Sequence, residues 1–231
     1  MIELDRVGRL YPDGGRVTGP ALHEVSLDIP DGELVALLGP AGSGTSTLMN
    51  ILSCLDVPSE GHYRIDGTDI GRLSKRRRTK LRGRAVGFVF ASFDLVPDAT
   101  VQRNVELPLI YKRAGVRRAR ARRALEKVGL AGHERDMPVE LFDAQRRKVL
   151  IARALVNDPP ILLDDEPTGA LDADSGDQIM QLFSELSAAG RTVVFATARA
   201  ETAAYAGRIV QLHEGRVVED RANLARRPST R

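Results

Sequence analysis

One segment constrains the fold more than any other: a short apolar run passes directly into a glycine-rich loop and then into a helical stretch. Residues 33–38 read ELVALL, which has the length and character of a buried β-strand. The loop GPAGSG at 39–44 follows at once, and TSTLMNIL at 45–52 has apolar residues at helical spacing. A strand that enters a helix through a tight glycine turn is typical of α/β folds with a parallel sheet.

Strand and helix signals alternate along the rest of the chain. Short apolar or alternating runs predict strands at 2–4, 25–29, 86–90, 161–163, 192–196 and 209–212, and helical spacing predicts helices at 145–155 and 174–188. The first strands, with Gly-rich and Asp-rich loops between them, favour an antiparallel sheet at one edge. We expect one domain over 1–220, a partly separate helical lobe over roughly 92–157, and a flexible basic tail at 221–231.

Charge is uneven although the formal net charge is only +3, because 16 of the 34 Lys and Arg residues lie in the windows 72–84 and 112–127. Such runs suit phosphates of nucleic acid or lipid headgroups, or they form the solvated faces of two helices. Neither window carries the interleaved aromatic residues that single-strand binders use for stacking. We therefore expect no specific nucleic-acid partner.

Several other classes are excluded by simple counts. No apolar run approaches the roughly 18 residues that a membrane span requires. The amino terminus has neither a basic start nor an apolar core, so we expect no export signal and a cytoplasmic protein. The single cysteine, Cys54, cannot form an internal disulfide, and no Cys/His spacing indicates a zinc site.

The glycine loop predicts a phosphate-binding cradle, because backbone N–H groups converge at the start of the following helix and its dipole favours negative charge. Gly39 and Gly44 have the spacing of the P-loop pattern G-x-x-x-x-G-K-[ST], and Ser46 occupies the hydroxyl position that meets magnesium. Thr45 stands where the pattern has lysine. A lysine there contributes a charge-assisted hydrogen bond of about 1.5 to 3 kcal/mol, whereas threonine offers one neutral donor.

Taken together, the motifs resemble those of ABC transporter ATP-binding subunits, closest to the branch that powers lipoprotein release, macrolide export and cell division. The resemblance covers about residues 2–220. It rests on GPAGSGTST (39–47), FVFASFDLVP (88–97), PVELFDAQRRKVLIARAL (138–155), ILLDDEPTGALD (161–172) and TVVFATARA (192–200).

This resemblance implies a RecA-like P-loop NTPase core with an antiparallel β edge and a helical lobe. It further implies a head-to-tail dimer, with itself or with a sister subunit, that sandwiches two ATP molecules with Mg²⁺ beneath integral membrane subunits. The chain would then lie at the inner face of the cell membrane, with the membrane partner docked around residues 91–97.

Carried over residue by residue, the resemblance assigns part of a working site. Tyr11 matches the aromatic residue that stacks on adenine, Asp165 and Ser46 match the magnesium-associated positions, and Glu166 matches the carboxylate that polarises the attacking water. The remaining nucleotide-binding positions are Gly39, Ala41, Gly42, Ser43, Gly44, Thr45 and Thr47. Asp164 stands where the family usually has a small residue. If the strand continues to Glu166, the two carboxylates share a face and the pKa of one is raised.

Other positions depart from the family. Ala91 lies where a glutamine contacts the metal and the water, and Ala198 lies where a histidine holds the γ-phosphate. The signature LSGGQ reads Leu-Phe-Asp-Ala-Gln here, so Phe142 removes a hydroxyl, while Asp143 and Ala144 replace glycines. Asp143 would place a like charge near a triphosphate, and we predict instead that it is the N-cap of the following helix.

Three functions remain open. The first is a degenerate subunit, a pseudo-ATPase with little or no ATP turnover that serves the assembly or regulation of a transport complex. The second is an active ATP-hydrolysing subunit, driving export or lipid and lipoprotein extraction, in which Arg199 or another basic residue replaces the missing lysine. The third is a binding module, unconnected with transport, for a different phosphorylated ligand.

Overall fold

A six-stranded sheet forms the centre of the molecule in the computed structural model, which describes residues 1–13, 16–17, 20–91 and 94–224. Its strands are β5 (Leu34–Leu38), β8 (Val86–Val89), β9 (Ile161–Asp165), β10 (Thr192–Thr197), β11 (Arg208–His213) and β12 (Arg216–Ala222). They lie in the order β12-β11-β5-β10-β9-β8, and all neighbours are parallel except β11 and β12. The carboxyl ends of β5, β9 and β10 therefore meet at one edge, where ligands bind in open α/β sheets.

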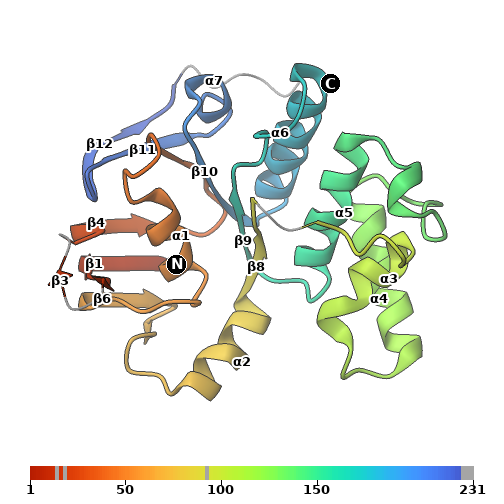
Figure 1. The fold of residues 1–231 in the computed structure, drawn as a ribbon, viewed down its shortest axis with the longest axis horizontal. Helices are drawn as coiled ribbons and strands as arrows, with labels where there is room; N and C mark the ends of the chain where they lie inside the picture. Colours follow the sequence, from red (N-terminus) through yellow and green to blue (C-terminus); the bar gives the residue numbers. More distant parts are fainter. Residues whose placement is uncertain (14–15, 18–19, 92–93, 225–231) are drawn as a thin grey trace.

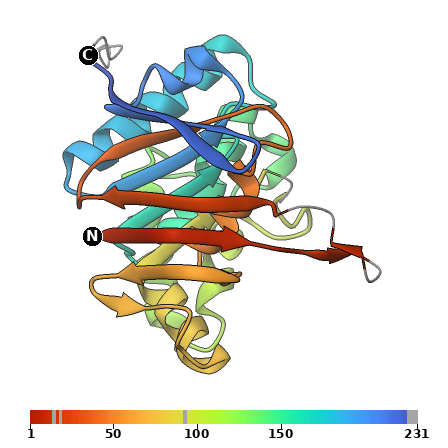
Figure 2. The ribbon, with the colours of Figure 1, turned by 90° about the vertical axis from the view of Figure 1, so that its left-hand side faces the viewer.

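An antiparallel sheet covers one side of this centre (Figure 2). It has the order β4-β1-β6-β7, with β1 at Ile2–Arg9, β4 at Leu22–Ile29, β6 at Glu60–Ile65 and β7 at Thr68–Asp69; β2 (Pro12–Asp13) pairs separately with β3 (Arg16–Val17). The helix α1 (Thr45–Leu52) contributes Leu48, Met49, Ile51 and Leu52 to one buried cluster with residues of both sheets. The helix α1, with the glycine loop at its start, is therefore packed against both sheets.

The remaining helices are α2 (Lys75–Ala85), α3 (Val101–Glu106), α4 (Ala114–Lys127), α5 (Asp143–Leu155), α6 (Ala173–Ala188) and α7 (Ala200–Ala203), with 3-10 turns η1 (Leu107–Leu109) and η2 (Pro138–Glu140). Of these, α3, α4, α5 and α6 pack on the other side, whereas α2 lies below the sheets (Figure 1) and packs against the first cluster through Leu81 and Ala85. A second buried cluster joins α3, α4, α5 and α6 to the central sheet, through residues such as Leu125, Ile151 and Phe183. This cluster fixes α5 against the strand that carries the acidic residues.

The predicted fold class is confirmed: the core is α/β and carries an antiparallel edge. The ordered chain runs past the expected boundary at residue 220, because β12 includes Arg221 and Ala222, and the Asn223 side chain donates hydrogen bonds to the carbonyls of Ala204 and Ala206. Residues 225–231 of the predicted tail lie outside the described residues. Among those described, no helix is long and apolar enough to cross a bilayer.

Candidate functional site

The glycine loop is shaped by contacts that only glycine permits. A Cβ at Gly39 would lie 2.4 Å from Ser43 Oγ, and a Cβ at Gly44, whose φ is +97°, would lie 2.7 Å from the carbonyl oxygen of Ala21. The Gly39 N–H donates to the carbonyl of Thr197 at 3.1 Å, which ties the loop to the end of β10. Gly42, with φ +82°, faces open space. The loop is therefore a fixed cradle at the edge where the parallel strands end.

This cradle retains the features of an anion site. Gly44 is the N-cap of α1 and supplies no side-chain cap, and α1 has no acidic residue in its first turn. The first amides of α1 are thus left for a ligand. The Ser43 hydroxyl is buried and has no hydrogen-bond partner. Ala41, Gly42 and Ser46 are exposed, and Thr45 and Thr47 are half-buried.

Ser46 and Asp165, the two residues expected to meet magnesium, lie within hydrogen-bonding distance of each other. Burial and the nearby charge of Glu166 raise the pKa of the Asp165 carboxyl, and the charge of Arg147 and a hydrogen bond with Ser46 oppose this rise. A hydroxyl beside a carboxylate at a phosphate cradle is the donor set that magnesium takes in P-loop proteins. Ser46 and Asp165 therefore fit this ion.

Glu166 turns away from the strand direction. Its φ is +60°, and its backbone N–H donates to the carbonyl of Ala196 at 3.0 Å. Its carboxylate accepts hydrogen bonds from the Ala198 backbone N–H at 2.9 Å and from the Thr197 hydroxyl at 3.3 Å. The residue expected to polarise water is thus held by the end of β10, next to the position where the family has histidine.

The condition under which Asp164 and Glu166 would share a strand face is not met, because β9 ends at Asp165. Asp164 is fully buried and forms an ion pair with Arg147 of α5, and Arg147 also donates to the Glu166 carbonyl at 3.2 Å. The pKa of Asp164 is raised, as expected for one of the two carboxyls, but the main cause is burial; the charges of Asp165 and Glu166 add to it, and Arg147 opposes it.

The predicted N-cap at Asp143 is wrong. The helix α5 begins at Asp143 itself and Phe142 is the N-cap residue, whose backbone N–H donates to Gln145 Oε1 at 3.0 Å. Asp143 forms an ion pair with Arg146 one turn on. Phe142 is 80% exposed, whereas Ala144 is buried. The altered signature therefore presents an aromatic ring, not a hydroxyl, at the surface.

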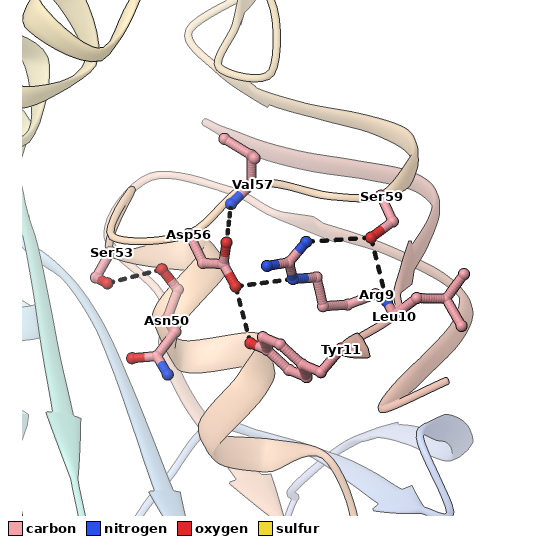
Figure 3. Close-up of polar contacts among 8 residues, drawn as sticks. All are labelled: Arg9, Leu10, Tyr11, Asn50, Ser53, Asp56, Val57 and Ser59. Atoms are coloured by element: carbon pink, nitrogen blue, oxygen red, sulfur yellow. Dashed lines mark hydrogen bonds and ion pairs between the residues drawn. The ribbon is translucent and has the colours of Figure 1, made fainter. Parts of the chain in front are cut away.

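Tyr11 lies in a polar cluster beyond the end of α1 (Figure 3). Its hydroxyl donates to Asp56 Oδ2 at 2.8 Å, and Arg9 Nε donates to the same oxygen at 2.8 Å. The Arg9 guanidinium lies 4.5 Å from the centre of the Tyr11 ring. The ring is therefore held in place and is 38% exposed. Its stacking on adenine stays a prediction.

Arg199 is the residue that one of the three hypotheses offers in place of the missing lysine. It is exposed and lines a cavity of about 200 Å³ together with Asp172 and Asp177 of the α6 region and Glu201 of α7. Within the described residues, no Lys or Arg side chain hydrogen-bonds to residues 39–47. Ala91 and Ala198 are exposed, and residues 92–93 of the expected docking segment lie outside the described part of the chain.

Sequence reasoning missed the residues that hold the site from behind. Arg147 and Thr197 lie within the motif segments 138–155 and 192–200 but had no expected role, and Arg9 and Asp56 lie outside the motifs. Arg147 and Thr197 contact carboxylates on other elements, and Asp56 holds Tyr11. Only Asp164 gave a signal, since an acidic residue in an otherwise apolar strand requires a buried partner.

Comparison with known proteins agrees with this geometry. The family model described as ABC transporter matches residues 22–169. An uncharacterized ABC transporter ATP-binding protein, YknY of Bacillus subtilis (strain 168), is 46% identical over 220 residues, which are 94% of this chain and 95% of that protein. The macrolide export ATP-binding/permease protein MacB 1/2 of Paracoccus denitrificans (strain Pd 1222) is 48% identical over 96% of this chain, but the match covers 33% of that longer protein.

Solved structures extend the likeness to three dimensions. The dimeric structure of MJ0796, described as a bacterial ABC transporter cassette, has a TM-score of 0.86 at 41% identity and covers 96% of this chain and 99% of that one. A dimeric post-hydrolysis state of MJ0796, bound to ADP and Pi, also has a TM-score of 0.86. The chain belongs to the ABC transporter family, as an ATP-binding, nucleotide-binding domain of the kind that serves membrane transport complexes.

Proposed function

We propose that this chain is a degenerate ABC subunit, a pseudo-ATPase whose scaffold serves the assembly or regulation of a transport complex. One observation carries the proposal: the cradle at residues 39–44 keeps its shape, but Thr45 stands in the lysine position. Among the described residues, no Lys or Arg side chain hydrogen-bonds to the loop in its place. Because a lysine contributes about 1.5 to 3 kcal/mol there, its loss weakens nucleotide binding by about 10- to 150-fold.

The remaining chemistry is incomplete in the same way. Ser46 and Asp165 would hold magnesium, which when bound neutralises phosphate charge. Glu166 keeps its carboxylate beside the Ala198 backbone N–H. Ala198 has no side-chain donor for a γ-phosphate, and Ala91 cannot orient a water. A single missing donor of this kind costs about 10² to 10³ in rate, so we expect little or no turnover.

A membrane partner is supported by a groove on the helical side. The groove has a volume of about 590 Å³ and lies between α2, β8, η1 and α5. Three of the exposed large apolar side chains line it, Leu55 (41%), Val96 (43%) and Leu107 (40%). Exposed apolar side chains gathered in one groove are typical of an interaction site. We propose that the membrane subunit docks here, next to the expected segment 91–97.

The experiment compares the natural chain with a variant that restores all six degenerate positions. The substitutions are Thr45→Lys, Ala91→Gln, Phe142→Ser, Asp143→Gly, Ala144→Gly and Ala198→His. Calorimetry with Mg-ATP measures binding, and phosphate release measures turnover. We expect the natural chain to bind ATP at least about 10-fold more weakly than the restored variant and to show no hydrolysis above background.

Glu166→Gln in both backgrounds is the matched control. In the restored variant it should abolish the turnover that the six substitutions bring. If the natural chain hydrolyses ATP at the rate of the restored variant, and Glu166→Gln removes that activity, the chain is an active ATPase and the proposal is wrong.

A further inference from the structure

The two basic windows of the sequence meet in space. A cavity of about 710 Å³ is lined by Lys80 and Arg84 of α2, by Lys112 and Arg120 from the start and middle of the α4 region, and by Tyr111. We call these five residues the basic face. In Figure 1, α2 and the α4 region both lie along the lower part of the molecule. Cations about 30 residues apart in sequence thus share one surface.

The cations of the basic face have no acidic partners in the described part of the chain. Within the described residues, neither Lys80, Arg84 nor Lys112 forms an ion pair, and the cavity has no acidic lining residue. Arg117 of the same helix, which does not line the cavity, pairs with Glu106. Like charges held together without partners repel one another, so the basic face favours an anionic surface.

Exposed apolar side chains lie beside these cations. Tyr111 is 96% exposed and Ile110 is 54% exposed. The cavity also shares Gly83, Pro108 and Asn157 with the apolar groove described above. A surface that combines cations with an exposed aromatic residue is typical of the membrane–water interface, where the ring lies at headgroup level.

We propose that the basic face binds the headgroups of an anionic lipid bilayer and so seats the subunit against the membrane beside its docking groove. The cations extend over a length that fits a lipid surface better than it fits a single small anion. The helix α2 alone is about 16 Å long at 1.5 Å per residue, and none of its 11 residues is buried. Clusters of four to eight Lys and Arg residues suffice for such binding.

Nucleic acid fits the face less well. Single-strand binders stack bases on several aromatic side chains, and Tyr111 is the sole aromatic residue lining the cavity in the described part of the chain. The helix α2 itself carries no aromatic residue at all.

The test uses the purified full chain and vesicles without other protein, so its outcome is independent of ATP binding and of the membrane subunit. Sedimentation compares phosphatidylcholine vesicles with vesicles that also contain phosphatidylglycerol. We expect binding only to the anionic vesicles, and weaker binding as salt rises, since the screening length falls from about 10 Å at 0.1 M to about 3 Å at 1 M.

A triple variant, Lys80→Gln/Arg84→Gln/Lys112→Gln, should bind about 100-fold more weakly, because each cation near a lipid surface contributes about 1 kcal/mol and 1.4 kcal/mol is tenfold. The matched control, Arg6→Gln/Arg216→Gln/Arg221→Gln, removes the same charge from exposed residues of β1 and β12. Equal loss in both variants overturns the proposal, as does equal binding to neutral vesicles. Tighter binding of single-stranded RNA, lost in the first variant alone, also overturns it.

Discussion

The buried pair between Arg147 and Asp164 offers a quantitative test of how the site is held. Asp164 is 0% exposed and the Arg147 side chain is 11% exposed, and removing one partner leaves the other charge buried and unpaired. Breaking a buried pair in this way costs about 3 to 5 kcal/mol. For a chain of this size each kcal/mol lowers Tm by about 2 to 4 °C, so Arg147→Met should lower Tm by about 6 to 20 °C.

The double variant Arg147→Met/Asp164→Ala removes both charges, and we expect it to recover most of that loss. Arg147 Nε and Asp164 Oδ2 have no hydrogen-bond partner, so the pair itself is imperfectly satisfied, and apolar replacements of buried pairs are often neutral or stabilising. Urea unfolding of the two single variants and the double variant gives the coupling energy directly.

Arg146→Met is the control on the same helix. Arg146 pairs with Asp143 at the surface, and such exposed pairs contribute about 0 to 1 kcal/mol. If the two single variants at Arg147 and Asp164 simply add in the double variant, or if Arg147→Met is no worse than Arg146→Met, the buried pair does not hold α5 to β9 and the reasoning fails.

Burial raises the pKa of Cys54 to about 11, so native protein should resist a thiol reagent at pH 8 and react once unfolded. Hydrogen bonds from Ser175 lower the pKa of Asp172. The stability that the Asp172 carboxylate contributes is therefore fully present above its ordinary pKa, and it is lost as the pH falls through the lowered pKa. Asp172→Asn, which caps as well, should lose less stability between pH 5 and 3. Gly39→Ala should cost about 1 to 3 kcal/mol by crowding Ser43, measured by urea unfolding.

The fold was largely predictable because its signals are local. The helix at 45–52 and the strand before it follow from apolar spacing and from glycines, and the structure places them within a residue of the prediction. The strands at 60–65 and 68–69 were missed, since they are short and partly polar. Asp143 shows the limit of residue preference: a good capping residue lies one position inside the helix, because Gln145 satisfies the Phe142 N–H instead.

The site was predictable where a motif fixes the main chain and not where two distant side chains meet. Arg147 and Asp164 are 17 residues apart and on different elements, so no periodicity connects them. Glu166 could be named as a candidate from its motif, but its positive φ and its bond to the Ala198 N–H depend on how β9 and β10 end. These contacts arise only when the parallel strands are assembled.

The altered residues belong to two different nucleotide sites of a dimer, and this decides which substitutions are needed to restore turnover. In a head-to-tail pair, the loop of one chain faces the signature of the other. Under the proposed function, Thr45 and Ala198 then impair the site that contains this chain's own loop, while Phe142 and Asp143 impair the site that contains the partner's. On this proposal, a pair of identical chains carries both kinds of defect in both sites, and a pair with an intact sister carries one kind in each site. Since residues of one constellation act as a unit, Thr45→Lys alone should improve ATP binding while leaving turnover close to that of the natural chain.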